Sequence, residues 1–257
     1  MKKVVLTLKD ISFSNNNNLI LENLSLDIEQ NTLTTIIGKS GSGKSTLAKI
    51  MAGLIIPTKG TLTIWGQDYY QISDKEKVDI RKRISFVFQN AALISNLSIK
   101  ENLILPLNFH YPEMIKKEQG ELVERMLEQV GMLKVINGRP AQLSIGEQKL
   151  VAIARALITK PELLFLDEPL GSLDATITRK LMDIIYTYSK HDWTTVVIVT
   201  YSKEIITGIC NRIMLLEEHK IKFNMSKNKV LSLPEKDMPD IITNMLNKYE
   251  FEEESEL

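Results

Sequence analysis

The sequence lacks the features that would place it outside the ordinary globular proteins. It has 257 residues and one cysteine, Cys210, so no disulfide can form within the chain, which suits a reducing compartment. Its 32 basic and 32 acidic residues cancel, which argues against nucleic-acid binding through a basic surface. No apolar run approaches the roughly 20 residues that span a bilayer, and we see no signal peptide. We therefore expect any membrane role to depend on a partner.

Short apolar runs alternate with helical patterns along the chain. The continuous runs at 163–167 and 194–200 are typical of strands buried on both faces of a parallel sheet. Further strands are expected at 4–8, 19–28, 33–37, 61–65, 84–88 and 213–217, and helices from 44 to about 53, at 143–157 and at 175–190. We expect Pro106, Pro112 and Pro140 to break the helical pattern between 90 and 158. This order predicts an α/β sheet with a β-rich N-terminal arm and a helical insert.

A glycine-rich segment, GKSGSGKS, lies between the predicted strand at 33–37 and the helix that follows. Glycines let the backbone curl, so that successive N–H groups can surround phosphate oxygens. Lys44 can reach the β- and γ-phosphates, and the Ser45 hydroxyl can ligate Mg²⁺. The segment predicts a P-loop core that binds a nucleotide through Gly38, Lys39, Ser40, Gly41, Ser42, Gly43, Lys44, Ser45 and Thr46.

Two carboxylates follow the buried run LLFL at 163–166. Asp167 is placed to hold Mg²⁺ through its water shell, and Glu168 to act as a base that polarises an attacking water. Alone, two acids at a strand end are more often a solvated edge. Together with the P-loop they predict ATP hydrolysis.

The segment LSIGEQKLVAIARAL, residues 143–157, predicts a helix with an unusual start. Ser144 and Glu147 have the spacing of a capping box. A Ser–x–Gly helix start is also suited to an anion, because free N–H groups and the helix dipole point there. The chain would then carry a second, incomplete phosphate site.

In order and spacing these segments resemble the ATP-binding-cassette ATPases of ABC transporters, over residues 4 to 221. The resemblance implies that two cassettes dimerise head to tail, as a homodimer or a heterodimer, with each ATP between the P-loop of one chain and the signature helix of the other. It implies that Ser144, Gly146 and Glu147, with Asp174 of GSLD, contact the nucleotide of the second chain. The phosphate site at Ser144 would be incomplete because its other half lies on another chain.

The same resemblance assigns family positions to three further residues. Gln89 matches the glutamine that contacts Mg²⁺ or water and links the ATPase to a transmembrane permease. Tyr201 stands where the family has its switch histidine, and Ile145 where its signature has a glycine. Glu147 also replaces a usual glutamine. We therefore include Gln89 and Tyr201 with Glu168 in the catalytic set, and expect slow hydrolysis.

The resemblance also implies the domain organisation. An ATPase domain would cover residues 1–221, with a helical subdomain inserted at about 90–160. Residues 222–257 would form a C-terminal extension with an amphipathic helix at 238–249 and an acidic end. That helix either packs on its own chain or braces the dimer. The expected location is the cytoplasmic face of the membrane, with contact only through the permease.

The segment 81–111 has the pattern of lipid-handling cassettes, and looks most like the ATPases of Mce-type phospholipid transport, with lipoprotein-release and macrolide-exporter cassettes close behind. We expect its apolar stretch 91–109, including Leu93, Leu97, Leu103 and Leu107, to receive a permease helix. The alternative is that these residues fill the helical subdomain. A second hypothesis is an ATP-dependent switch without translocation, as in cell-division cassettes.

Overall fold

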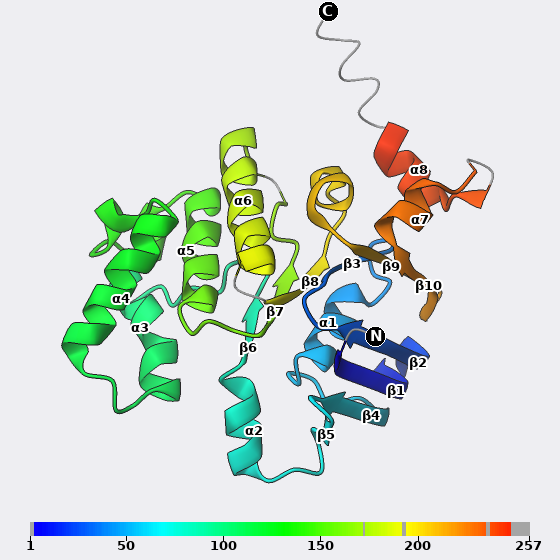
Figure 1. The fold of residues 1–257 in the computed structure, drawn as a ribbon, viewed down its shortest axis with the longest axis horizontal. Helices are drawn as coiled ribbons and strands as arrows, with labels where there is room; N and C mark the ends of the chain where they lie inside the picture. The colour runs from blue at the N-terminus through cyan, green and yellow to red at the C-terminus, as the bar shows by residue number, and fades with distance from the viewer. Residues whose placement is uncertain (1–2, 172, 192–193, 235–236, 248–257) are drawn as a thin grey trace, which may run out of the picture. The chain divides into compact units, whose positions relative to one another are not determined.

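The computed structural model describes residues 3–171, 173–191, 194–234 and 237–247. The chain divides into two compact units, both drawn in Figure 1. Unit 1 comprises Met1–Ile72 and Thr195–Leu257, and unit 2 comprises Ser73–Thr194.

Unit 1 begins with an antiparallel sheet in the order β2-β1-β4-β5. The strands are β1 (Val4–Asn15), β2 (Asn18–Glu29), β4 (Lys59–Ile64) and β5 (Gln67–Asp68). Asn16 and Asn17 make the turn between β1 and β2 with φ of 47° and 65°, a region that asparagine tolerates. The β-rich N-terminal arm is thereby confirmed.

A second set of strands in unit 1 has the order β10-β9-β3-β8. Strand β3 (Leu33–Ile37) pairs in parallel with β8 (Thr195–Val199) and β9 (Arg212–Glu217), and all residues of β3 and β8 are buried. Burial on both faces explains the apolar run in β8, whereas β3 also contains two buried threonines, Thr34 and Thr35. The fold is mixed α/β, as predicted.

Beyond residue 219 the structure contains elements for which the sequence analysis has no counterpart. Strand β10 (Lys220–Ser226) pairs antiparallel with β9, and α7 (Lys227–Leu231) follows at once. The sequence KIKFNMS alternates polar and apolar residues, and its apolar members Ile221, Phe223 and Met225 are half-buried while both lysines are exposed. This period-two pattern is a strand signal that the sequence analysis missed.

The remaining helical elements of unit 1 are α1 (Lys44–Met51), a π-helical turn (Ile205–Ile209) and α8 (Asp240–Asn247). Ile242 of α8 is fully buried, which favours packing on its own chain over a dimer brace. The side chains of 245–249 and the acidic end lie outside the described residues. Cys210 is buried after the π-helical turn, and burial raises the pKa of its thiol to about 11.

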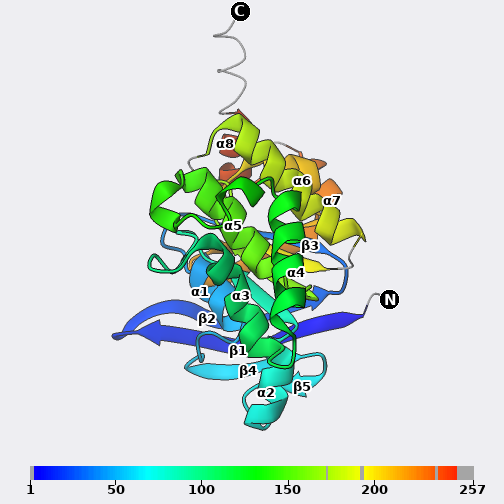
Figure 2. The ribbon, with the colours of Figure 1, turned by 90° about the vertical axis from the view of Figure 1, so that its left-hand side faces the viewer.

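Unit 2 contains a parallel strand pair, β6 (Ile84–Val87) and β7 (Leu163–Asp167), together with its helices. The helices are α2 (Asp74–Arg81), α3 (Ile99–His110), α4 (Lys116–Gln129), α5 (Ile145–Leu157) and α6 (Ala175–His191), with 3-10 turns at Leu133–Val135 and Pro140–Gln142. Helices α3, α4 and α5 lie side by side and form the predicted helical subdomain (Figure 2).

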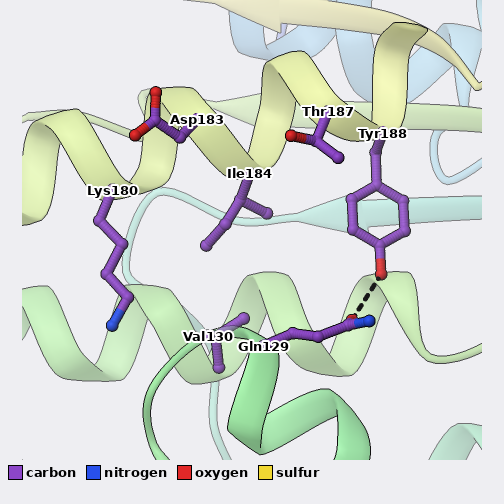
Figure 3. Close-up of a pocket in the computed structure, with 7 residues that line it drawn as sticks. All are labelled: Gln129, Val130, Lys180, Asp183, Ile184, Thr187 and Tyr188. Carbon is purple, nitrogen blue, oxygen red and sulfur yellow. Dashed lines mark hydrogen bonds between the residues drawn. The ribbon is translucent and has the colours of Figure 1, made fainter. Parts of the chain in front are cut away.

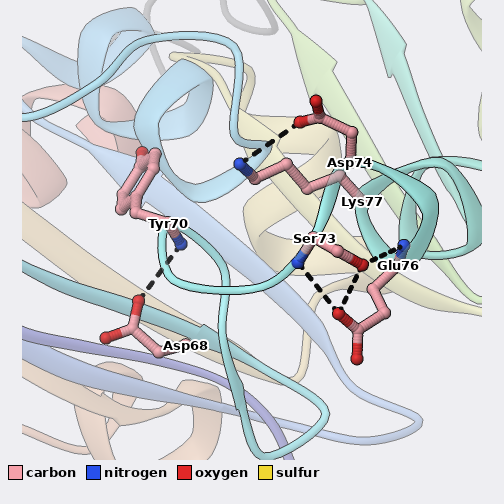
Figure 4. Close-up of polar contacts among 6 residues, drawn as sticks. All are labelled: Asp68, Tyr70, Ser73, Asp74, Glu76 and Lys77. Carbon is pink, nitrogen blue, oxygen red and sulfur yellow. Dashed lines mark hydrogen bonds and ion pairs between the residues drawn. The ribbon is translucent and has the colours of Figure 1, made fainter.

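Three helices of unit 2 start with the same capping box. At α2 the Ser73 hydroxyl accepts the Glu76 N–H, while the Glu76 carboxylate accepts from the Ser73 N–H at 2.9 Å (Figure 4). Ser98 with Glu101 repeats this arrangement at α3. Ser144 with Glu147 repeats it at α5, as the sequence predicted. Each box satisfies two backbone donors at a helix start.

Two expectations about the residues of helix α3 are wrong. Pro106 lies inside the helix and does not break it, so packing of the buried residues around it outweighs one missing backbone bond. Leu103 and Leu107 are fully buried, so they belong to the core and cannot receive a permease helix. Leu93 and Leu97 are half-buried.

Among the described residues, none of the helices combines the length and the apolar character that a bilayer span requires.

Candidate functional site

The P-loop runs from the end of β3 into α1, and two of its glycines are required by close contacts. A Cβ on Gly38 would lie 2.1 Å from the carbonyl oxygen of Leu216. Gly43 has φ of 97°, and its Cβ would lie 2.9 Å from a methyl carbon of Ile20. Larger residues at either position would force the loop away from its present path.

Lys44 lies at the first position of α1 and is 6% exposed. Its ammonium donates to the carbonyl oxygens of Gly38 at 2.8 Å and Lys39 at 2.9 Å. It also donates to the Tyr201 hydroxyl at 2.5 Å and lies 4.3 Å from the centre of that ring. The structure thus pairs the P-loop lysine with the residue that replaces the expected histidine.

Two observations show that the P-loop fits a phosphate group. The Ser42 hydroxyl is buried without a hydrogen-bond partner among the described residues. Gly43 at the N-cap has no side chain that could cover the first N–H groups of α1. Unsatisfied donors at a helix start are suited to an anion.

In unit 2, β7 carries Asp167 to its carboxyl end, where the residue is 4% exposed. Glu168 follows at once, half-buried and with φ of 47°. A left-handed backbone is unusual for glutamate and is found where surrounding contacts enforce it.

Sequence reasoning missed a buried lysine that contacts this turn. Lys149 of α5 is 5% exposed and donates to the carbonyl oxygens of Glu168 at 2.9 Å and Gly171 at 3.1 Å. A charged residue at an otherwise apolar position of the helical pattern was the available signal, because lysine is rarely buried without a partner.

Arg155, also on α5, was missed as well. Its guanidinium donates to the carbonyl oxygens of Ala91 and Ala92 at 2.9 and 2.8 Å, and both alanines have positive φ. Gln89 lies just before them and is exposed. Arg155 therefore fixes the backbone of the segment that follows Gln89.

The start of α5 shows how the signature residues are arranged. The Glu147 carboxylate accepts from the Ser144 N–H at 2.8 Å and from the Ser144 hydroxyl at 2.9 Å. Ile145 is 65% exposed, and a Cβ on Gly146 would lie 3.1 Å from Ile177 of α6. Gly146 thus allows close packing of α5 against α6.

Asp174 is exposed and precedes α6. Its carboxylate accepts from the Ile177 N–H at 2.9 Å, and its carbonyl oxygen accepts from the Thr178 N–H. Asp174 therefore acts as a helix cap within its own chain. Its neighbour Ser172 lies outside the described residues.

The comparisons with known proteins agree with these motifs. The family model for the ABC transporter matches residues 21–171. This chain is an ABC transporter ATPase. The ABC transporter ATP-binding protein YknY of Bacillus subtilis is 39% identical over 203 residues, which cover 79% of this chain and 86% of YknY. The methionine import ATP-binding protein MetN of Clostridium acetobutylicum is 32% identical over 93% of this chain and 74% of MetN.

The solved structures include the ATP-binding cassette MJ0796, in a dimeric post-hydrolysis state with ADP and phosphate. It matches with a TM-score of 0.80 and 32% identity, over 86% of this chain and 98% of that one. A second dimeric structure of the same cassette has 33% identity. The ABC ATPase described here is accordingly the ATP-binding, ATP-hydrolysing subunit of a transporter.

The ATPase also has a hollow of about 390 Å³ between the end of α4 and α6 (Figure 3). The Tyr188 hydroxyl donates to the Gln129 side-chain oxygen across one end, at 3.1 Å. Lys180 and Asp183 bring opposite charges to its wall. None of the residues predicted to bind nucleotide lines this hollow.

Proposed function

We propose that this ABC ATPase drives the transport of a lipid or lipoprotein through a separate permease at the cytoplasmic face of the membrane. The segment 81–111, which resembles lipid-handling cassettes, supports the substrate class. Five exposed apolar residues within the segment 94–115, on α3 and its flanking segments, support the membrane partner, and their exposure is the observation that carries the proposal.

Within each chain, the P-loop residues 38–46 would hold the phosphates of ATP. Lys44 would exchange its carbonyl and Tyr201 contacts for phosphate oxygens, because a charge-assisted bond to phosphate is stronger than one to a neutral acceptor. Glu168 would orient and deprotonate the attacking water.

Mg²⁺ would be held by Ser45, Asp167 and Gln89. A hydroxyl, a carboxylate and an amide oxygen are the hard ligands that this ion prefers. The ion would neutralise part of the phosphate charge that develops during transfer.

Two chains would dimerise head to tail on ATP, and the dimeric structures of the MJ0796 cassette support a dimer. Ser144, Gly146, Glu147 and Asp174 would then contact the nucleotide of the second chain. To donate to a phosphate, the Ser144 hydroxyl must release the Glu147 carboxylate that it now contacts. The capping box is therefore a contact that ATP-driven dimerisation would rearrange.

We expect the Tyr201→His variant to hydrolyse ATP faster than the parent, by up to about 10²-fold. Histidine can donate and change protonation at neutral pH, whereas tyrosine has an ordinary pKa near ~10. Steady-state phosphate release by both proteins measures the effect.

The matched control is Tyr201→Phe, which keeps the ring beside Lys44 and removes the hydroxyl, and should give no increase. A parent that already turns over at about 10 per second, with a histidine variant no faster, would show that Tyr201 does not limit the rate.

Substitutions of the exposed apolar residues can separate the proposed permease contact from folding. These residues are Ile94 (42% exposed), Leu105 (38%), Phe109 (64%), Tyr111 (37%) and Ile115 (58%). We expect Phe109→Glu with Ile115→Glu to abolish co-purification with the permease while ATP affinity and the unfolding temperature stay unchanged. An exposed pair of apolar residues gains little stability from its own chain and much from a partner.

Leu103→Asp is the contrasting variant, because Leu103 is fully buried and a carboxylate there should unfold the helical subdomain. Normal assembly of the double-glutamate variant would place the permease contact elsewhere.

The substrate class is tested on the complex purified with its permease and reconstituted in vesicles. The proposal predicts that ATP drives extraction or transfer of a labelled phospholipid or lipoprotein. Methionine transport, as the name MetN states for that relative, would contradict it.

A slow ATP-dependent switch is the second candidate, favoured by the Tyr201–Lys44 contact at the P-loop and by Ile145 in the signature. Such a switch would recruit an extracellular hydrolase through its membrane partner and move no substrate. Identifying the subunits that co-purify from membranes separates the two functions.

A further inference from the structure

Lys149 is the most unusual buried charge of unit 2. It lies in the second turn of α5, one turn beyond the signature residues, and 95% of its surface is covered. Both of its hydrogen bonds go to backbone carbonyls of one turn, those of Glu168 and Gly171.

The buried surroundings of Lys149 disfavour its charged form, yet the ammonium is held at one defined place by its hydrogen bonds. Burial lowers the pKa of the ammonium, while the nearby charge of Glu168 acts in the opposite direction. A long flexible side chain that is held inside the protein loses rotamer freedom and hydration. These costs are offset by the two carbonyl bonds, so the side chain has a defined target.

That target is the backbone of the proposed catalytic carboxylate. Glu168 has φ of 47°, a conformation that neighbouring contacts must enforce. Lys149 donates to the carbonyl oxygen of Glu168 and to that of Gly171, so its ammonium bridges the first and last residues of the turn 168–171.

We propose that Lys149 is a positioning residue for ATP hydrolysis, which fixes the turn 168–171 and thereby the direction of the Glu168 carboxylate. The inference rests on the proposed role of Glu168 as the catalytic base. Because Lys149 and Ser144 belong to α5 and its cap, a shift of the signature helix would also reach Glu168.

The first test is Lys149→Met, which keeps the apolar stem and removes the donors. We expect kcat to fall about 10- to 100-fold, because small misplacement of a catalytic group costs rates of this order. KM and the dissociation constant for ATP should stay within about twofold. Lys149→Gln, which keeps two N–H donors, should recover part of kcat. Lys134→Met, at an exposed position, is the matched control and should be unchanged.

The second test is the same substitution in a Glu168→Gln background, with residual hydrolysis measured in single turnovers. If Lys149 acts through Glu168, the double variant hydrolyses ATP at the rate of Glu168→Gln alone. An equal further loss in the double variant would overturn the proposal, as would an unchanged kcat in Lys149→Met. Hydrolysis at the parent rate by Glu168→Gln would instead overturn the role of Glu168 itself. Should Lys149→Met fail to fold, Lys149→Gln carries both comparisons.

Discussion

Replacing Glu168 with glutamine is expected to lower ATP hydrolysis by about 10²–10⁴-fold, the usual contribution of a positioned general base. The amide keeps the size of the carboxylate but cannot accept the proton of the attacking water. The variant should bind ATP as tightly as the parent and accumulate as an ATP-bound dimer. Single-turnover hydrolysis, with light scattering in the presence of ATP, measures both effects.

Glu124→Gln is the matched control, because Glu124 is an exposed glutamate on α4. It should leave hydrolysis unchanged. Hydrolysis at the parent rate by the Glu168 variant would mean that another group activates the water.

Replacing Lys44 with alanine should weaken ATP binding by at least about 10²-fold. Several charge-assisted bonds of about 1.5–3 kcal/mol each would be lost together. Of the two carbonyl oxygens that Lys44 now contacts, the one on exposed Lys39 can be hydrated, whereas Gly38 is buried and loses a partner. One unsatisfied buried acceptor costs about 1–3 kcal/mol, so the variant should be less stable but still folded. Isothermal titration calorimetry with ATP and Mg²⁺ gives the affinity, and thermal unfolding gives the stability.

Lys49→Ala provides the comparison within the same helix, since Lys49 lies in the last turn of α1, away from the P-loop. Its ATP affinity should match that of the parent. An unchanged affinity in Lys44→Ala would exclude residues 38–46 as the phosphate site.

The central strands were predictable from the sequence because burial on both faces favours short runs of apolar and β-branched residues. Strands β3 and β7 begin and end at the predicted residues, 33–37 and 163–167. The cap of α5 was predictable because Ser144 and Glu147 are close in sequence. These features depend on local patterns alone.

Features that depend on tertiary packing were not predictable in this way. Edge strand β10 is not such a feature, because KIKFNMS alternates polar and apolar residues and this signal was available in the sequence. Pro106 is tolerated inside α3 because the helix packs through Leu103 and Leu107 on either side of it. A single-sequence pattern contains neither the neighbouring strand nor the neighbouring helix.

In the candidate site, too, the features formed by contiguous residues were predictable and the contacts between distant residues were not. The P-loop and the Asp167–Glu168 pair are each a contiguous segment of the sequence, so the roles of their residues could be predicted from the sequence directly. The contact of Lys44 with Tyr201 joins residues 157 positions apart, and Lys149 reaches Glu168 across 19. Such contacts follow from the fold, and they change how the neighbouring residues are expected to behave.

The central claim is that each ATP lies between the P-loop of one chain and the signature helix of another. Mixing two inactive variants, Lys44→Ala and Ser144→Arg, tests this claim most directly. A mixed dimer would contain one intact site, formed by the P-loop of the Ser144 variant and the signature helix of the Lys44 variant. The account predicts that mixing restores hydrolysis to about a quarter of the parent rate, since half of the dimers are mixed and each has one of two sites. No recovery on mixing, with both variants folded and able to dimerise, would contradict it.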